Sequence, residues 1–178
     1  GKIIAGGAFT SFNGVVATRI VRLNGDGTID GGFVTGGGFN GTVSALVVQG
    51  DGRILGCGLF TTYNGATANR LVRLLPTGAI DPSLPVNVAF NNSVPVLAVQ
   101  PADGKILAAS EDGWLVLMDP NPNAYTELAR YRALQGKTWN VPAVSGGRIY
   151  FRSTLEAVSL DVAIKAQPRL DLQIVWTT

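Results

Sequence analysis

A short glycine-led pattern recurs four times along the chain and constrains its fold more than any other feature of the sequence. The copies are Gly1-Lys2-Ile3, Gly52-Arg53-Ile54, Gly104-Lys105-Ile106 and Gly147-Arg148-Ile149. A period of roughly 40 to 50 residues is typical of repeat architectures in which each copy forms one small sheet, such as propeller blades. We therefore divide the chain into units that start at residues 1, 52, 104 and 147.

The first two units match each other without a gap. The shared residues recur 51 positions later and are, in the first unit, Phe9, Thr10, Asn13, Gly14, Arg19, Val21, Arg22, Leu23, Gly27, Ile29 and Asp30. Asp51-Gly52 and Asp103-Gly104 separate apolar runs, which is a strong hairpin signal because glycine accepts the positive φ that tight turns require. The sequence thus predicts short antiparallel strands joined by tight turns.

The distribution of apolar residues favours a propeller over a two-sheet sandwich. The predicted strands at residues 3–5 and 45–48 are apolar on both faces, whereas a sandwich strand has one face in water. Blades that pack face to face bury both faces of their inner strands. We also predict a strand, rather than a helix, within residues 123–134.

The fold prediction is therefore all-β. It comprises β-propeller-like tandem blades of four-stranded antiparallel sheets in an incomplete ring, with three full units and part of a fourth. The repeat segment covers residues 1–165, and residues 166–178 form either a closing strand or the start of a following segment. An incomplete array leaves a sheet edge uncovered, so we expect completion by further sequence, another chain or another domain.

Composition narrows the possible partners. The 14 Lys and Arg residues and 12 Asp and Glu residues are scattered, without a run of like charge that could follow a phosphate backbone, so nucleic acid is not expected as a partner. No apolar run approaches the ~20 residues that a membrane-spanning helix needs. The chain starts at Gly1 without an initiator Met or a signal-peptide pattern, and we expect it to be a mature or truncated piece of a longer protein.

The residues offer little for catalysis. The chain has no His, which excludes His-based triads and metal sites, and its single Cys57 lies in an apolar strand as a small core residue. The segment Asn24 to Asp30 resembles a calcium loop but has the wrong register, so a hairpin turn is favoured. Asp112-Gly113 is interpreted as a turn, and Trp114 and Trp139 as packing residues between blades. We predict no catalytic residue, no metal and no cofactor.

Two insertions carry the candidate binding residues. The segments 9–14 and 60–65 are predicted to project on one rim, where loops on a rigid scaffold concentrate binding residues. The candidate ligand-binding residues are Phe12, Asn13, Arg19, Tyr63, Asn64 and Arg70. The alternative is structural: the aromatic residues anchor the loops and Asn-Gly forms a tight turn. Recurrence in two successive units favours this alternative.

Residues 1 to about 100 resemble the delta-type repeats of large bacterial β-propeller surface proteins. The resemblance rests on the glycine-led pattern, the Phe-Thr and Asn-Gly positions and the Val-Arg-Leu strand. From Gly104 to about residue 165, the patterns Leu115 to Asp119 and Gly136 to Pro142 are similar to quinoprotein-like (PQQ-like) propeller repeats. These resemblances imply a secreted, periplasmic or cell-surface propeller within a multidomain bacterial protein.

Two functions follow as hypotheses. The first is a non-catalytic extracytoplasmic propeller segment that acts as a structural scaffold or as a protein- or glycan-binding module. The alternative is part of a quinoprotein-like oxidoreductase or another propeller enzyme, whose active site lies in blades outside this sequence.

Overall fold

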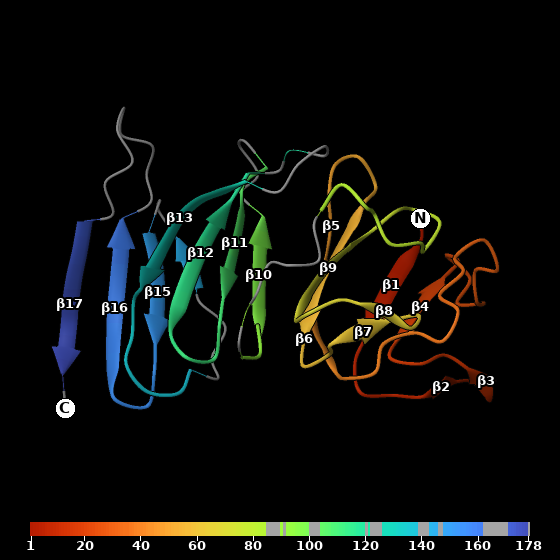
Figure 1. Cartoon of the computed structure of the whole chain (residues 1–178), viewed down its shortest axis with the longest axis horizontal. Coiled ribbons are helices and arrows are strands. Elements are labelled where there is room, and N and C mark those ends of the chain that lie inside the picture. Colours follow the sequence, from red (N-terminus) through yellow and green to blue (C-terminus); the bar gives the residue numbers. More distant parts are fainter. Residues whose placement is uncertain are drawn as a thin grey trace.

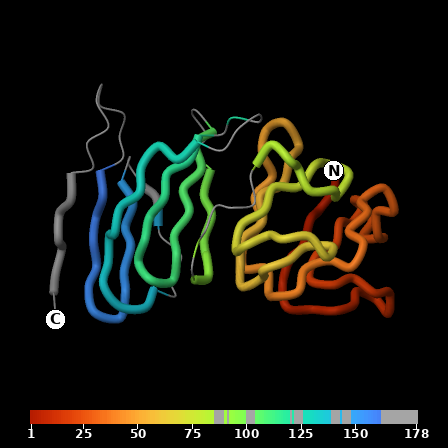
Figure 2. Tube along the Cα trace, viewed as in Figure 1, coloured from red at the N-terminus to blue at the C-terminus, as the bar shows by residue number. Residues whose placement is uncertain are grey.

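The computed structural model describes residues 1–84, 90, 92–99, 104–119, 121, 126–138, 143–145, 148–161 and 171–177. These residues form antiparallel sheets that follow one another along the long axis of the molecule (Figures 1 and 2). The N-terminal and C-terminal sheets lie at opposite ends (Figure 1). The predicted all-β propeller fold is confirmed, and we refer to the successive sheets as the first to the fourth blade.

The first two blades share one plan. The first blade consists of β1 (Ile3–Gly6), β2 (Ser11–Phe12), β3 (Val15–Val16) and β4 (Ile20–Leu23). In it, β1 pairs with β4, and the hairpin β2–β3 lies between them in sequence. The second blade consists of β5 (Val43–Val48), β6 (Ile54–Gly58), β7 (Thr62–Tyr63), β8 (Ala66–Thr67) and β9 (Leu71–Leu74). Its sheet order is β5-β6-β9, with β7–β8 as the inserted hairpin.

The third and fourth blades are four-stranded meanders. The third contains β10 (Val96–Val99), β11 (Ile106–Ala109), β12 (Trp114–Met118) and β13 (Glu127–Arg132). The fourth contains β14 (Ala143–Ser145), β15 (Arg148–Arg152), β16 (Glu156–Asp161) and β17 (Asp171–Thr177). Strand β13 confirms the strand predicted within residues 123–134, although residues 123–125 lie outside the described part. Trp139 lies outside it as well.

The four repeated isoleucines occupy equivalent places. Each lies two residues after a glycine of the repeat, and each faces an apolar residue near the end of the next strand of its sheet. The pairs are Ile3 with Leu23, Ile54 with Leu74, Ile106 with Met118, and Ile149 with Leu160. The sequence repeat is therefore a structural repeat.

The first two blades differ from the expected four-stranded sheets. Their outermost strand is reduced to single bridges, Leu23 with Ile29 and Leu74 with Ile80. The next residues, Asp30 and Asp81, turn their carboxylates onto arginines of the same blade instead of extending the strand. The fourth sheet is more complete than the sequence match indicates, because β17 pairs along the whole of β16.

Three apolar clusters fill the spaces between successive blades. The cluster between the first two blades includes Ile20, Phe39, Ile54 and Val72. The next joins Leu55 and Cys57 of the second blade to residues of the third such as Ile106 and Val116. The last joins residues of the third blade, such as Leu115, to residues of the fourth, such as Leu160. Alternate residues of one strand enter opposite clusters because a β-strand projects successive side chains to opposite faces.

Candidate functional site

The hairpins β2–β3 and β7–β8 are built alike. Asn13 and Gly14 have φ values of 47° and 77°, and Asn64 and Gly65 have 47° and 79°. Positive φ at both central residues is the signature of a type I′ turn, which suits the twist of a two-residue hairpin and favours Asn-Gly. The Asn-Gly turn expected from the sequence is confirmed in both blades. Asn13 and Asn64 lie exposed at the tips.

Arg19 and Arg70 hold the base of each hairpin. Both adopt a left-handed backbone, with φ of 66° and 65°. Their amides donate to the carbonyls of Phe9 and Phe60, at 2.8 Å and 3.0 Å. The Arg19 guanidinium donates to the Phe39 carbonyl at 2.7 Å, whereas that of Arg70 donates to the Leu59 carbonyl. Both guanidinium groups are therefore engaged with backbone oxygens.

The aromatic residues of the two hairpins differ in exposure. Phe12 is half-buried. Tyr63, at the equivalent position, is 1% exposed and packs on Phe39 with ring centroids 4.5 Å apart. Its hydroxyl donates to the Gly78 carbonyl at 2.7 Å, and burial raises its pKa. The Tyr63 ring thus anchors the hairpin and presents no face to solvent.

Asn64 connects its hairpin to the segment that precedes the second blade. Its side-chain oxygen accepts a hydrogen bond from the Gly37 amide at 3.0 Å. The hairpins β2–β3 and β7–β8 form separate two-stranded sheets. The structure therefore places the six candidate residues on two equivalent hairpins. Their role in ligand binding stays a prediction.

A shallow groove of about 580 Å³ lies beside the second hairpin. Its lining includes Gly32, Val34, Asn64, Ala66, Thr77 and Ile80. Val34 is 69% exposed there. Sequence reasoning found Asn64 but missed Val34, which precedes the Gly-rich segment at 36–38 and gave no signal in the repeat. A second groove, of about 510 Å³, lies between the third and fourth blades and includes Tyr131, Arg132 and Glu156.

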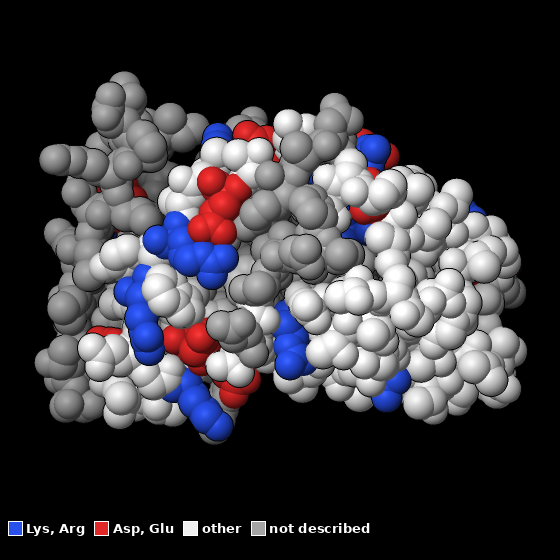
Figure 3. All heavy atoms as spheres, in the orientation of Figure 1, with Lys and Arg blue, Asp and Glu red and all other residues white. Residues whose placement is uncertain are grey.

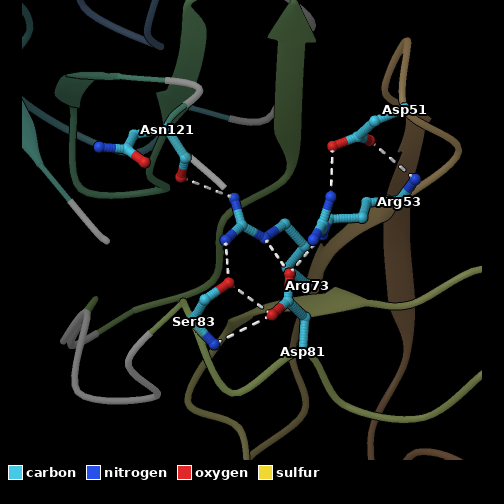
Figure 4. Close-up of polar contacts among 6 residues, drawn as sticks. All are labelled: Asp51, Arg53, Arg73, Asp81, Ser83 and Asn121. Carbon is cyan, nitrogen blue, oxygen red and sulfur yellow. Dashed lines mark hydrogen bonds and ion pairs between the residues drawn. The ribbon is translucent and has the colours of Figure 1, made fainter. Parts of the chain in front are cut away.

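An aspartate in each of the first two blades pairs with two cationic side chains of its own blade. The Asp81 carboxylate lies 2.8 Å from the side chains of both Arg53 and Arg73, and it also accepts hydrogen bonds from Ser83 (Figure 4). Burial acts to raise the pKa of Asp81. The Ser83 hydrogen bonds and the two arginines outweigh it, so the pKa lies below its usual value.

Asp30 occupies the same position in the first blade. It lies 2.6 Å from Lys2 and 2.7 Å from Arg22. The Lys2 hydrogen bond, followed by that of the Gly32 amide, lowers the pKa of Asp30 to about 2. Both aspartates are therefore carboxylates at neutral pH. Each pairs with an arginine of one strand and with a cationic side chain just before the neighbouring strand. The repeat contained these residues, but sequence reasoning assigned them no contacts.

The same arginines reach into the following blade. The Arg73 guanidinium donates to the Asn121 carbonyl at 3.2 Å (Figure 4), beyond the end of β12. The Arg22 guanidinium donates to the Pro76 carbonyl, beyond the end of β9. In the third blade Leu117 takes this place, because it faces Leu107 as Arg73 faces Leu55. This hydrogen bond from an arginine to the next blade, which we call the arginine tie, is therefore a feature of the first two blades.

The other residues that the sequence offered for chemistry are buried or make contacts within the fold. Cys57 is fully buried, and burial raises its pKa to about 12. Asp112 accepts a hydrogen bond from Ser110 within the turn before β12, as the turn interpretation predicted. Trp114 is half-buried, with the Arg132 guanidinium 5.8 Å from its ring centroid. In the supposed calcium loop, Asp26 accepts from the amide and hydroxyl of Thr28.

Within the described ranges, no group of three or more His, Cys, Asp or Glu side chains could hold a metal ion. The same ranges contain no helix long and apolar enough to cross a membrane.

Comparisons with known proteins address the fold. The model of a domain of unknown function (DUF5122), a beta-propeller, matches residues 1–33 and 49–84. No curated protein sequence matches the chain. A crystal structure from Thermus thermophilus, whose name assigns it to the oxidoreductases as a glucose dehydrogenase, superposes with a TM-score of 0.52 at 14% identity. The match covers 99% of this chain and 67% of that one. With its successive antiparallel sheets, the chain has the β-propeller fold, and its first two blades match the DUF5122 repeat.

Proposed function

We propose that this chain is a non-catalytic part of an extracytoplasmic propeller, in which the blades act as a scaffold and the hairpins as a binding surface for a protein or a glycan. The proposal includes the assignment of residues 1 to about 100 to delta-type repeats and of residues 104–165 to quinoprotein-like repeats. Fractionation of the source cells tests the location: recovery from the medium, the cell surface or the periplasm supports it, and recovery from the cytoplasm alone contradicts it.

The observation that carries the proposal is the repeated hairpin on a rigid base. Both hairpins have the same backbone ties at Arg19 and Arg70, and both expose their turns. Such a frame holds exposed groups without a large loss of entropy on binding. At the first hairpin the exposed groups include Val15 and Val16, with exposures of 53% and 82%, and Asn13 at the turn.

The charge distribution fits an uncharged partner surface. Figure 3 shows few charged side chains over the first two blades on the face that it presents, whereas Lys, Arg, Asp and Glu mix over the third and fourth. Apolar groups beside an amide match the apolar faces and hydroxyls of sugars, or a weakly charged protein surface.

A binding screen with two variants tests the proposal. Glycans and extracellular proteins are screened against the chain, and each hit is measured again with Val16→Ser and with Leu128→Ser. Leu128 is an exposed apolar control on the third blade, at 43% exposure. We expect Val16→Ser to weaken binding at least about tenfold and Leu128→Ser to leave it unchanged. Equal binding by both variants contradicts a role for the hairpin.

The second candidate function is that of an oxidoreductase segment. The superposed Thermus structure, named as a glucose dehydrogenase, favours it. At 14% identity the likeness concerns the fold, so the test is chemical. Because this candidate places the active site in blades outside the chain, the whole protein that carries the chain is mixed with pyrroloquinoline quinone and calcium. A protein-bound quinone spectrum supports this candidate, and the spectrum of free quinone alone contradicts it.

A further inference from the structure

Strand β1 has one edge without a partner among the described residues. It pairs with β4 on one side only. The equivalent strand of the second blade, β6, lies between β5 and β9, and that of the third, β11, lies between β10 and β12. Within the described ranges, no strand of the first blade occupies the edge that β5 and β10 occupy in the next two blades.

The side chains along this edge are exposed where their counterparts are buried. Ile3 is 58% exposed, whereas Ile54, Ile106 and Ile149 are 2%, 1% and 3% exposed. Phe9 is half-buried, whereas Phe60 is completely buried. In the second blade, the segment before Gly52 covers these positions: β5 pairs along β6, and Phe39 packs on Phe60 with centroids 4.3 Å apart.

Gly7 gives an independent indication of a strand at this edge. Its counterpart, Gly58, cannot carry a side chain, because a Cβ there would lie 2.1 Å from the Thr42 carbonyl oxygen, just before β5. The two glycines are equivalent, since their amides donate to the carbonyls of Arg19 and Arg70. At Gly7, however, a Cβ would meet only the Phe9 ring, at 3.2 Å. No backbone within the described residues requires glycine at position 7, but a strand crossing as Thr42 does would require it.

We propose that the free edge of β1 binds an extended segment of the same repeat type, with the sequence pattern of Phe39–Val48. The segment runs antiparallel to β1, places an apolar residue opposite Ile3 as Val48 lies opposite Ile54, and passes over Gly7 as Thr42 passes over Gly58. An aromatic residue in the position of Phe39 packs between Phe9 and Phe12. This is strand addition to a sheet edge, in which the backbone supplies affinity and alternate side chains supply specificity.

A tethered segment tests the proposal in the full chain. A copy of residues 38–51 is placed directly before Gly1, which reproduces the connection between β5 and Gly52. We expect the melting temperature to rise by about 4 °C or more, because a paired strand replaces an exposed apolar edge. A prefix of the same composition in shuffled order is the matched control and is expected to leave the melting temperature unchanged.

Gly7→Ala distinguishes edge pairing from general stabilisation. The substitution fits the unextended chain, because φ at Gly7 is not positive and only a side chain is near. It blocks the crossing segment and is therefore expected to abolish the gain from the prefix. Gly50→Ala, at a glycine with no atom within 4 Å, is the control and is expected to preserve it.

A peptide of residues 38–51 added to the unextended chain provides a second readout. We expect the peptide to slow hydrogen exchange at residues 3–6 of the parent chain. For Gly7→Ala we expect the same protection to need at least about ten times more peptide. Equal effects of native and shuffled prefixes, or a gain that survives Gly7→Ala, would overturn the proposal. Dimerisation through β1 that the peptide does not reverse would overturn it too, in favour of a second copy as the occupant.

Discussion

Arg73 and Asn121 connect two blades through one hydrogen bond, 3.2 Å from the Arg73 guanidinium to the Asn121 carbonyl. The Arg73 side chain is 1% exposed and also pairs with Asp81 in its own blade. In the first blade, Arg22 makes the corresponding contact with the Pro76 carbonyl, and its side chain is 16% exposed. The same interaction between blades therefore occurs in a buried environment at Arg73 and in a partly exposed one at Arg22.

Arg73→Met should destabilise the protein more than Arg22→Met. Removing Arg73 leaves the buried Asp81 carboxylate with Arg53 as its remaining arginine and costs about 2 kcal/mol, whereas removing the partly exposed Arg22 costs about 1 kcal/mol or less. Unfolding by urea measures both variants. A larger loss of stability for Arg22→Met than for Arg73→Met would contradict the buried tie.

Asp30 should make stability depend on pH below 4. Its pKa in the folded chain is about 2, lowered by Lys2 first, and an unfolded aspartate titrates near 3.9. Because the folded pKa is the lower one, the stabilisation is complete above about pH 4 and is lost as the pH falls toward 2. We expect Asp30→Asn to flatten this part of the stability curve. An NMR titration that places the pKa of Asp30 near 3.9 would contradict the assignment.

The two hairpin asparagines should respond differently to glycine. Glycine adopts the positive φ of both positions without strain, so Asn13→Gly should change stability by less than about 0.5 kcal/mol. Asn64→Gly also removes the hydrogen bond that Gly37 donates and should cost about 1 kcal/mol. Thermal unfolding of the two variants measures the difference. Equal effects would mean that the contact with Gly37 contributes nothing.

Cys57 should react with thiol reagents only after unfolding. Its thiol is fully buried, and burial raises its pKa to about 12. At pH 8 the thiolate fraction is thereby about a thousandfold below that of a free cysteine. We expect native protein to resist a disulfide reagent that modifies the urea-unfolded chain within minutes. Modification of the native chain at the free-cysteine rate would contradict this burial.

The fold could be predicted because the repeat records a geometric requirement in each copy. Isoleucine returns at the start of equivalent strands, where it faces an apolar residue of the neighbouring strand, and Asn-Gly returns where each hairpin needs two positive φ values. The burial of Tyr63 could not be predicted in this way. Tyr63 lies in a polar loop sequence, and its burial depends on Phe39, a residue from a separate segment whose approach no local pattern reveals.

The ion pairs could not be predicted for a related reason. Asp81 and Arg53 are 28 residues apart, and Arg73 and Asn121 are 48 apart, so their proximity depends on how sheets pair and stack. The identical recurrence of Asp30, Arg22 and their counterparts was the available signal. It indicated a shared structural role without identifying the contacts.

The arginine ties give the array a direction. Each arginine reaches toward the C-terminal neighbour, to a carbonyl beyond the end of that blade's third strand, and accepting this bond requires a free oxygen but no particular side chain. A blade of the first type can therefore be followed by a blade of a different sequence class, as the second is followed by the third. The third blade has Leu117 at the position of the arginine and therefore donates no such hydrogen bond to the fourth. When a blade of the first type precedes a blade of the other type, the hydrogen bond between them is kept.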